Sequence, residues 1–206
     1  MKLTFLGTGA ADWNINSYDA MPFFRRNSSA LIDGTLLIDG KDIHSYKMET
    51  LRNSIGIVPQ KAVLFKGTIR ENLLWGNENA TEEELWAALE TAQAAQVVRD
   101  KEGGLEAEVA QGGTNFSGGQ RQRLTIARAL VRKPKILILD DSASALDYAT
   151  DAALRQAIRG VENPPTTFIV SQRASSVRFA DIILVLEDGE MVDSGTHEEL
   201  LSRCAV

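Results

Sequence analysis

The sequence is poor in the residues that build disulfides and zinc sites. Cys204 is the only cysteine among 206 residues, and His44 and His197 are the only histidines. A single thiol excludes an intrachain disulfide and a multi-cysteine metal site. The two histidines stand far apart and belong to no ligand cluster, so we expect no zinc or two-metal centre.

Long apolar runs and an excess of basic charge are also missing. No stretch approaches the ~18 apolar residues that span a bilayer, and the start MKLTFLGTG lacks the apolar core of a signal peptide. The net charge is −6 and the basic residues are scattered, which argues against a nucleic-acid partner. We therefore expect a cytoplasmic chain without a transmembrane segment, either one domain or one incomplete larger domain.

Residues 115–147 hold the densest pattern in the chain, NFSGGQRQRLTIARALVRKPKILILDDSASALD. Ser117 precedes Gly118 and Gly119, so its hydroxyl can cap a helix start while the glycines admit another molecule to the backbone. The following helix has one apolar face and several arginines, and it ends before Pro134. An anion would find hydrogen-bond donors at its start.

A buried strand and a pair of carboxylates follow this helix. The apolar run 136–139 fits a strand covered on both faces of a parallel sheet, and Asp140 and Asp141 stand at its carboxyl end. Ligands of open α/β sheets bind at that edge. Adjacent carboxylates there suit a hydrated Mg²⁺ and an activated water, which indicates nucleoside-triphosphate chemistry.

These residues carry a specific resemblance. FSGGQRQRLTIARAL resembles the signature motif of ATP-binding-cassette (ABC) proteins, ILILD resembles their Walker B strand and SALD their D-loop. IGIVPQ resembles the Q-loop, and KAVLFKGTIRENLLWG resembles the exporter branch of the family. The resemblance begins near Gly34 and covers residues 34–206. It implies an α/β fold, namely an incomplete ABC-type ATPase domain with a mostly parallel sheet, N-terminal β strands and a helical subdomain at roughly 62–132.

The resemblance also implies roles for individual residues at the chain's own nucleotide site, with ATP and Mg²⁺ as cofactors. Asp140 would bind Mg²⁺, and Gln60 would reach the metal or the attacking water and report occupancy to a membrane domain. Asp141 and Gln172 stand where the family usually has a catalytic glutamate and a switch histidine. Aspartate is one methylene shorter, and glutamine cannot change charge near neutral pH, so the resemblance implies a weakened catalytic pair.

A second group of residues is implied to act on a nucleotide held by another subunit. In the family the signature motif closes over the partner's nucleotide, and the D-loop aspartate bridges the two halves. The residues of this chain at those positions are Ser117, Gly118, Gly119, Gln120 and Asp147.

The phosphate-holding P-loop of such ATPases, GxxxxGKS or GxxxxGKT, occurs nowhere in the chain. The nearest imitation, residues 6–12, has a glycine turn but no lysine, and Asp12 would repel phosphate. We expect it to be a plain strand-turn, and we expect the isolated chain neither to bind ATP tightly nor to hydrolyse it.

Residues 1–33 differ from the rest of the chain. MKLTFLGTGAADW with FRRNSSALIDGTLLIDG resembles the opening strands of metallo-β-lactamase-fold hydrolases, but the histidine-rich metal motif of that family is absent. We place a fusion junction near Gly34, where the two resemblances overlap.

Local patterns predict several further elements. Thr68 with Glu71, and Thr81 with Glu84, form capping-box patterns that predict helices from about 69 and 82. Residues 85, 88, 89 and 92 form an apolar stripe typical of a core-facing helix. The stretch 181–193 predicts a hairpin that turns at 188–189, and Thr196 caps a final short helix.

The leading hypothesis is the ATP-binding subunit or domain of an ABC-type exporter, which couples ATP binding and hydrolysis to transport. It would act through its signature on a second nucleotide-binding domain, in a heterodimer, and it would lie at the inner face of the cell membrane through a membrane-spanning partner. Two alternatives remain open: a fusion fragment without function, and a fragment of a metal-dependent hydrolase without its metal site.

Overall fold

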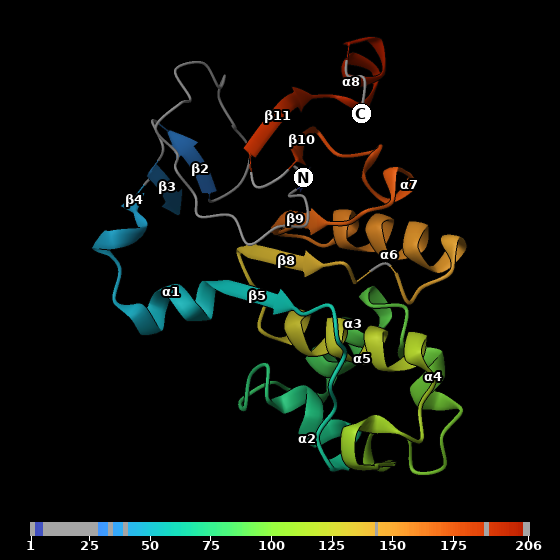
Figure 1. The fold of residues 1–206 in the computed structure, drawn as a ribbon. Coiled ribbons are helices and arrows are strands. Elements are labelled where there is room, and N and C mark those ends of the chain that lie inside the picture. The colour runs from blue at the N-terminus through green and yellow to red at the C-terminus, as the bar shows by residue number, and fades with distance from the viewer. Residues whose placement is uncertain are drawn as a thin grey trace.

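The computed structural model describes residues 3–5, 29–32, 35–38, 41–142, 144–187 and 190–203. The predicted turn at 188–189 and the glycine turn at 6–12 lie outside these ranges. The described chain forms a six-stranded sheet with helices on both faces and a helical subdomain beyond one end of it (Figure 1).

The six-stranded sheet has the order β11-β10-β1-β9-β8-β5. All neighbouring strands in it are parallel except β10 and β11, which form the predicted antiparallel hairpin. This mostly parallel arrangement confirms the α/β prediction. The strands are β1 (Leu3–Phe5), β5 (Ile55–Val58), β8 (Ile136–Asp140), β9 (Thr166–Val170), β10 (Ile182–Glu187) and β11 (Glu190–Gly195).

β1 lies inside this sheet, between β9 and β10. Its residues pair with β9 from Leu3↔Thr167 to Phe5↔Ile169, and with β10 at Thr4↔Ile182 and Phe5↔Ile183. The short strand expected at the start of the chain therefore belongs to the same sheet as the strands from residues 34–206.

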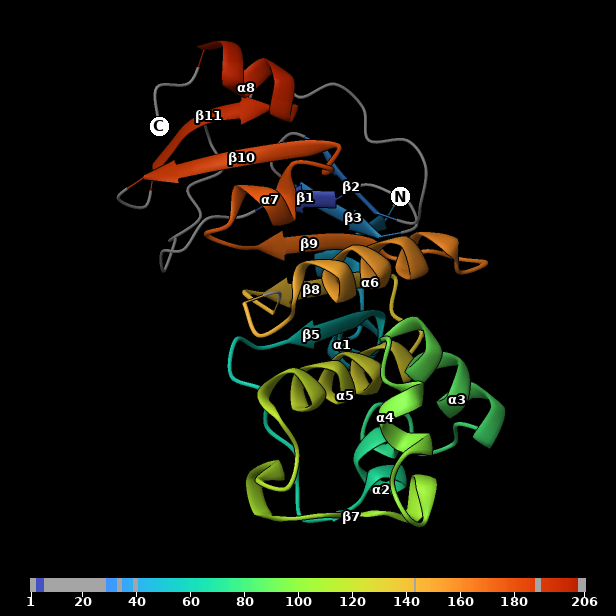
Figure 2. The same ribbon diagram turned by 90° about the vertical axis from the view of Figure 1, so that its right-hand side faces the viewer.

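The helices around the sheet follow from local capping and apolar spacing. α5 (Gly118–Val131) packs against β5, and α6 (Tyr148–Gly160) lies along β8 and β9 in Figure 2. α1 (Met48–Ser54) leads into β5, α7 (Ala174–Val177) follows β9, and α8 (His197–Arg203) ends the described chain. Thr196 and Glu199 cap α8 as predicted.

The helical subdomain stands beyond the β5 end of the sheet (Figures 1 and 2). It holds α2 (Ile69–Leu74), α3 (Glu82–Thr91) and α4 (Ala95–Arg99), with the short strands β6 (Gly67–Thr68) and β7 (Glu108–Val109). Both predicted capping boxes are present, so α2 and α3 begin at residues 69 and 82. The predicted stripe on α3 is buried and joins the main apolar core.

A small antiparallel sheet precedes α1. Its strands are β2 (Ser29–Ile32), β3 (Thr35–Ile38) and β4 (Lys41–Asp42), followed by the 3₁₀ turn η1 (Ile43–Ser45). Two further 3₁₀ turns, η2 (Gly104–Glu106) and η3 (Gln111–Gly113), lead toward α5.

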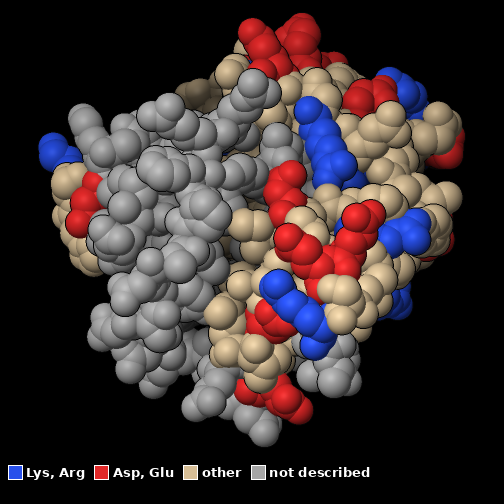
Figure 3. Space-filling view, turned by 90° about the horizontal axis from the view of Figure 1, so that it is seen from above, with Lys and Arg blue, Asp and Glu red and all other residues tan. Residues whose placement is uncertain are grey.

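Acidic and basic side chains alternate on the described part of the face shown in Figure 3. Arg203 and Asp193 form an ion pair of 3.2 Å that joins α8 to β11. Basic groups do not gather into one patch on that visible part, in keeping with the net charge of −6.

Candidate functional site

The predicted site residues at the ends of three parallel strands lie at one edge of the sheet. β5, β8 and β9 run side by side in the same direction, so their carboxyl ends meet at one edge. Gln60 follows β5, Asp140 ends β8, and Gln172 follows β9. The Gln60 Nε2 atom lies 3.4 Å from the Asp141 Oδ2 atom, which brings together residues 81 positions apart.

Asp141 turns the chain sharply as it leaves β8. Its φ is +41°, a left-handed conformation that is uncommon outside glycine and costs on the order of 1 kcal/mol. Its amide donates to the Val170 carbonyl at 2.8 Å, and its own carbonyl accepts from the Ser144 amide and hydroxyl. These bonds hold the strained residue where the chain leaves β8.

The two adjacent carboxylates fit a hydrated Mg²⁺. Asp140 is exposed and Asp141 is half-buried, so both remain reachable from solvent. Mg²⁺ keeps several waters and takes only one or two protein carboxylates, usually with substrate phosphates. The described residues contain no cluster of three histidine, cysteine or acidic side chains, so phosphate and water would have to supply the remaining Mg²⁺ ligands.

The loop after β9 is tied to the loop after β8. Ser171 is buried, and its hydroxyl accepts from the Arg173 amide at 3.0 Å. The Arg173 guanidinium donates to the Ser144 carbonyl at 3.1 Å. Gln172 lies between Ser171 and Arg173 and is exposed, at the carboxyl edge where the sequence predicts it.

α6 supports both loops from behind. Asp147 caps it by accepting from the Thr150 amide and hydroxyl, and the hydroxyl bond is the main cause of a lowered Asp147 pKa. One turn further, Asp151 and Arg155 form a buried ion pair of 3.1 Å. Arg155 also donates to the Ser176 carbonyl of α7 at 2.7 Å. Burial raises the pKa of Asp151, because it penalises the ionised carboxylate.

The start of α5 presents open backbone. Ser117 accepts from the Gln120 amide, and the Gln120 side chain accepts from the Ser117 amide, which completes a capping box. A Cβ on Gly118 would meet nothing within 4 Å, so the backbone there is open to another molecule. A Cβ on Gly119 would lie 3.1 Å from the Ala145 carbonyl oxygen, so this helix start lies close to the backbone at Ala145. Among the interactions seen in the described chain, none joins Ser117 to Asp140.

The arginines of α5, together with Arg132 at its C-cap, have a role that the sequence pattern does not reveal. They hold backbone carbonyls of surrounding segments: Arg121 that of Phe116, Arg123 that of Gln93, Arg128 that of Val63, and Arg132 those of Arg52 and Gly76. A charged helix face predicts solvent exposure, and only the folded chain shows which carbonyls lie within reach. Burial lowers the pKa of Arg128.

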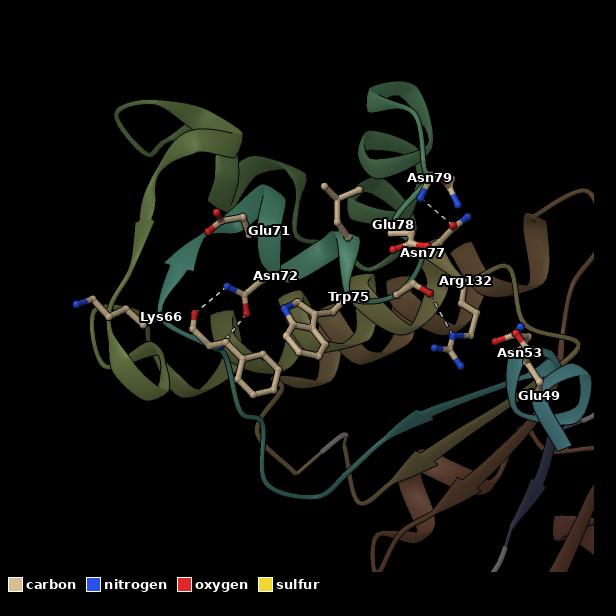
Figure 4. Close-up of a pocket in the computed structure, with 13 residues that line it drawn as sticks. Glu49, Asn53, Lys66, Glu71, Asn72, Trp75, Asn77, Glu78, Asn79 and Arg132 are labelled. Carbon is tan, nitrogen blue, oxygen red and sulfur yellow. Dashed lines mark hydrogen bonds between the residues drawn. The ribbon is translucent and has the colours of Figure 1, made fainter.

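A pocket of about 1000 Å³ opens beside the helical subdomain (Figure 4). Phe65 and Trp75 line it with ring centroids 5.0 Å apart, and both are exposed, Trp75 at 67%. Asn72 fixes the Phe65 backbone by accepting from its amide and donating to its carbonyl, each at 2.8 Å. Phe65 follows Gln60 by five positions along the chain, and most of the other side chains that line the pocket are polar.

Comparison with known proteins identifies the family of this arrangement. A family model described as ABC transporter matches residues 24–144, more than half of the chain. The chain belongs to the ABC transporter family. The match begins ten residues before Gly34, within the segment that the sequence assigns to a different origin.

Relatives and a solved structure place the chain among exporter-like members. It is 47% identical over 174 residues to an uncharacterized ABC transporter ATP-binding protein of Mycobacterium tuberculosis, covering 83% of this chain and 30% of that protein. It is 48% identical over 169 residues to the uncharacterized ABC transporter ATP-binding protein YfiB of Bacillus subtilis, covering 82% and 29%. A bacterial Atm1-family ABC exporter with ATP bound superposes with a TM-score of 0.80 at 34% identity, covering 99% of this chain and 35% of that chain.

The chain thus spans about a third of the length of these proteins. In the part of the chain that the structure describes, no helix has both the length and the apolar content to cross a membrane.

Proposed function

We propose that this chain is the ATP-binding part of an exporter-type ABC transporter, and that it acts through the start of α5 on a nucleotide held by a partner subunit. One observation carries the proposal. The capped, exposed start of α5 offers open backbone at Gly118, on the 14-residue helix that carries the family signature. Free amides and the positive end of the helix dipole attract phosphate there.

The chain's own sheet edge supports independent hydrolysis less well. Asp140 and Asp141 bring two negative charges to it, and the sequence has no P-loop lysine to offset the charge of a nucleotide. Asp141 and Gln172 replace the family's glutamate and histidine. We propose that Asp140 and Gln60 hold Mg²⁺ there only when a partner encloses the nucleotide, and that Asp147 bridges the two halves of a heterodimer.

The pocket at Phe65 and Trp75 supports a second partner, a membrane-spanning transporter domain. Exposed aromatic rings beside a polar rim suit a protein contact. A partner seated there would adjoin the segment that carries Gln60, so it could sense nucleotide at the sheet edge and keep this chain at the inner face of the membrane.

We also propose that residues 1–33 have a different origin from residues 34–206. The support is their resemblance to metallo-β-lactamase-fold strands. Reading the coding sequence across Gly34 from intact genomic DNA tests this, and an uninterrupted P-loop upstream of that codon would contradict the fusion.

The central experiment mixes this chain with complete ATP-binding domains of the Mycobacterium tuberculosis and Bacillus subtilis relatives. We expect their ATPase rates to rise, a Ser117→Arg variant to abolish the rise by blocking the helix start, and a Ser117→Thr variant to retain it because threonine preserves the cap. Calorimetry of the isolated chain should show no micromolar binding of Mg-ATP. Unchanged rates with both domains would leave the fusion fragment without function as the better explanation. Equal stimulation by Ser117→Arg would show that the chain does not act through the start of α5.

A further inference from the structure

β1 is the only strand that joins the two halves of the described six-stranded sheet. On one side it pairs with β9, and through β9 with β8 and β5. On its other side it pairs with β10, and through β10 with β11. The pairing involves only the three residues Leu3–Phe5, whereas β9 and β10 are five and six residues long.

Without β1, two parallel strand edges would face each other unpaired. The facing residues are buried, at 5% exposure or less: Thr167 and Ile169 of β9 and Ile183 of β10. Water therefore could not readily replace the backbone hydrogen bonds that these strands would lose. β10 and β11 would become a two-stranded ribbon, which is marginally stable by itself. The interior of the sheet therefore contains a position shaped for one extended strand that runs parallel to both neighbours.

We propose that the gap between β9 and β10 is a binding slot for an extended parallel strand, filled here by residues 3–5, and that it also accepts this segment as a separate peptide. The recognition is mainly through the backbone, as in other cases of strand addition. Leu-Thr-Phe suits it because apolar, β-branched and aromatic residues favour strands. The occupant is the N-terminal segment of the same chain, which fills the slot in cis, and the separate peptide serves as the probe for the slot.

The test uses the full chain with Thr4→Pro, beside a Thr4→Val control. Proline cannot donate to the ladder and is not tolerated in a central strand, whereas valine keeps the amide and the branched side chain. We expect Thr4→Pro to lower the thermal midpoint by several degrees and Thr4→Val to leave it near wild type.

A synthetic peptide of residues 1–8 then tests the slot directly. It should raise the midpoint of Thr4→Pro in a concentration-dependent way, because a ligand that binds only the folded state stabilises it. The same peptide with proline at position 4 should have no effect. If Thr4→Pro is insoluble, the wild-type peptide should restore soluble protein during refolding. An unchanged midpoint in Thr4→Pro, or no rescue by the peptide, would overturn the proposal.

Amide exchange in the wild-type chain gives an answer that needs no variant. Every amide of an interior strand donates to one neighbour or the other, so Thr4 and Phe5 should exchange as slowly as the amides of β9. Exchange at the rate of a free peptide would show that the slot does not hold the segment.

Discussion

Gly76 occupies a position where the packing leaves no room for a side chain. It follows Trp75 at the end of α2 and lies against the backbone of α5, and a Cβ would overlap with the Arg128 carbonyl oxygen. Arg132 fixes the same turn by donating to the Gly76 carbonyl at 3.2 Å. This one glycine therefore allows the end of α2 to approach α5 closely.

Gly76→Ala should destabilise the fold by about 2–3 kcal/mol, because the overlap is with rigid helix backbone and the turn must move. Gly160→Ala is the matched control. Gly160 ends α6, and a methyl group added there would meet nothing within 4 Å, so alanine should be neutral or stabilise by up to about 1 kcal/mol. Urea unfolding of both variants measures the difference, and equal midpoints would contradict the close approach.

At the scale of elements, the Asp151–Arg155 pair joins α6 to α7 behind the loops that carry Asp147 and Gln172. Both side chains are buried, and the raised pKa of Asp151 shows that its desolvation outweighs its attraction to Arg155. Arg155 thus connects the pair in α6 to α7 through the Ser176 carbonyl. Removing one partner should be far worse than removing both.

Arg155→Met should destabilise the fold by about 3 kcal/mol at neutral pH, while the double variant Asp151→Leu with Arg155→Met should lie within about 1 kcal/mol of wild type. Loss of the arginine should raise the pKa of Asp151 further. A carboxyl group whose pKa is higher in the folded than in the unfolded state contributes stability that is fully present at pH values below its unfolded-state pKa. This stability is lost as the pH rises through its folded-state pKa.

The free energy of unfolding of Arg155→Met should therefore be only slightly below that of wild type at pH values below the ordinary aspartate pKa, and the difference should grow as the pH rises. Denaturant unfolding across this range checks the sign. A deficit that is independent of pH, or a double variant as unstable as the single one, would show that the pair does not behave as a buried ion pair.

The whole molecule contains three features on which the proposed function rests: the sheet edge with Asp140 and Asp141, the exposed start of α5, and the pocket with the exposed rings of Phe65 and Trp75. The pocket and the sheet edge are connected by the segment from Gln60 to Phe65, which Arg128 holds at the Val63 carbonyl with an N···O distance of 3.0 Å. In our proposal, a partner seated on Trp75 would lie beside the segment that leads back to Gln60 and that Arg128 of α5 contacts.

If Trp75 contacts the proposed membrane-spanning partner, Trp75→Glu should weaken binding of this chain to the full-length Bacillus subtilis relative roughly tenfold or more, because it places a charge on the exposed ring surface of the pocket. Leu201→Glu is the control, since Leu201 is similarly exposed, at 73%, but lies on α8. Co-purification in detergent measures both variants. Equal retention of the two would place the contact elsewhere.

Features set by residues close together in the sequence could be predicted, whereas contacts between distant residues could not. The capping boxes at Thr68 and Thr81 predict the first residues of α2 and α3, because each involves only three residues of separation. The apolar run before Asp140 predicts β8 for a similar reason. The contact between Gln60 and Asp141, and the carbonyl partners of the α5 arginines, depend on residues brought together from distant parts of the chain.

The sequence alone determined the α/β class, the starts of the capped helices, the buried strand before Asp140 and the resemblance to the ABC family, because these rest on short-range patterns of capping, apolar spacing and motif. Only the tertiary structure decided that Leu3–Phe5 lies between β9 and β10, which come from the far end of the chain. It also decided which backbone carbonyls the half-buried arginines of α5 contact. Strand pairing and these guanidinium contacts are chosen by the global fit of all elements, which no local window of sequence contains.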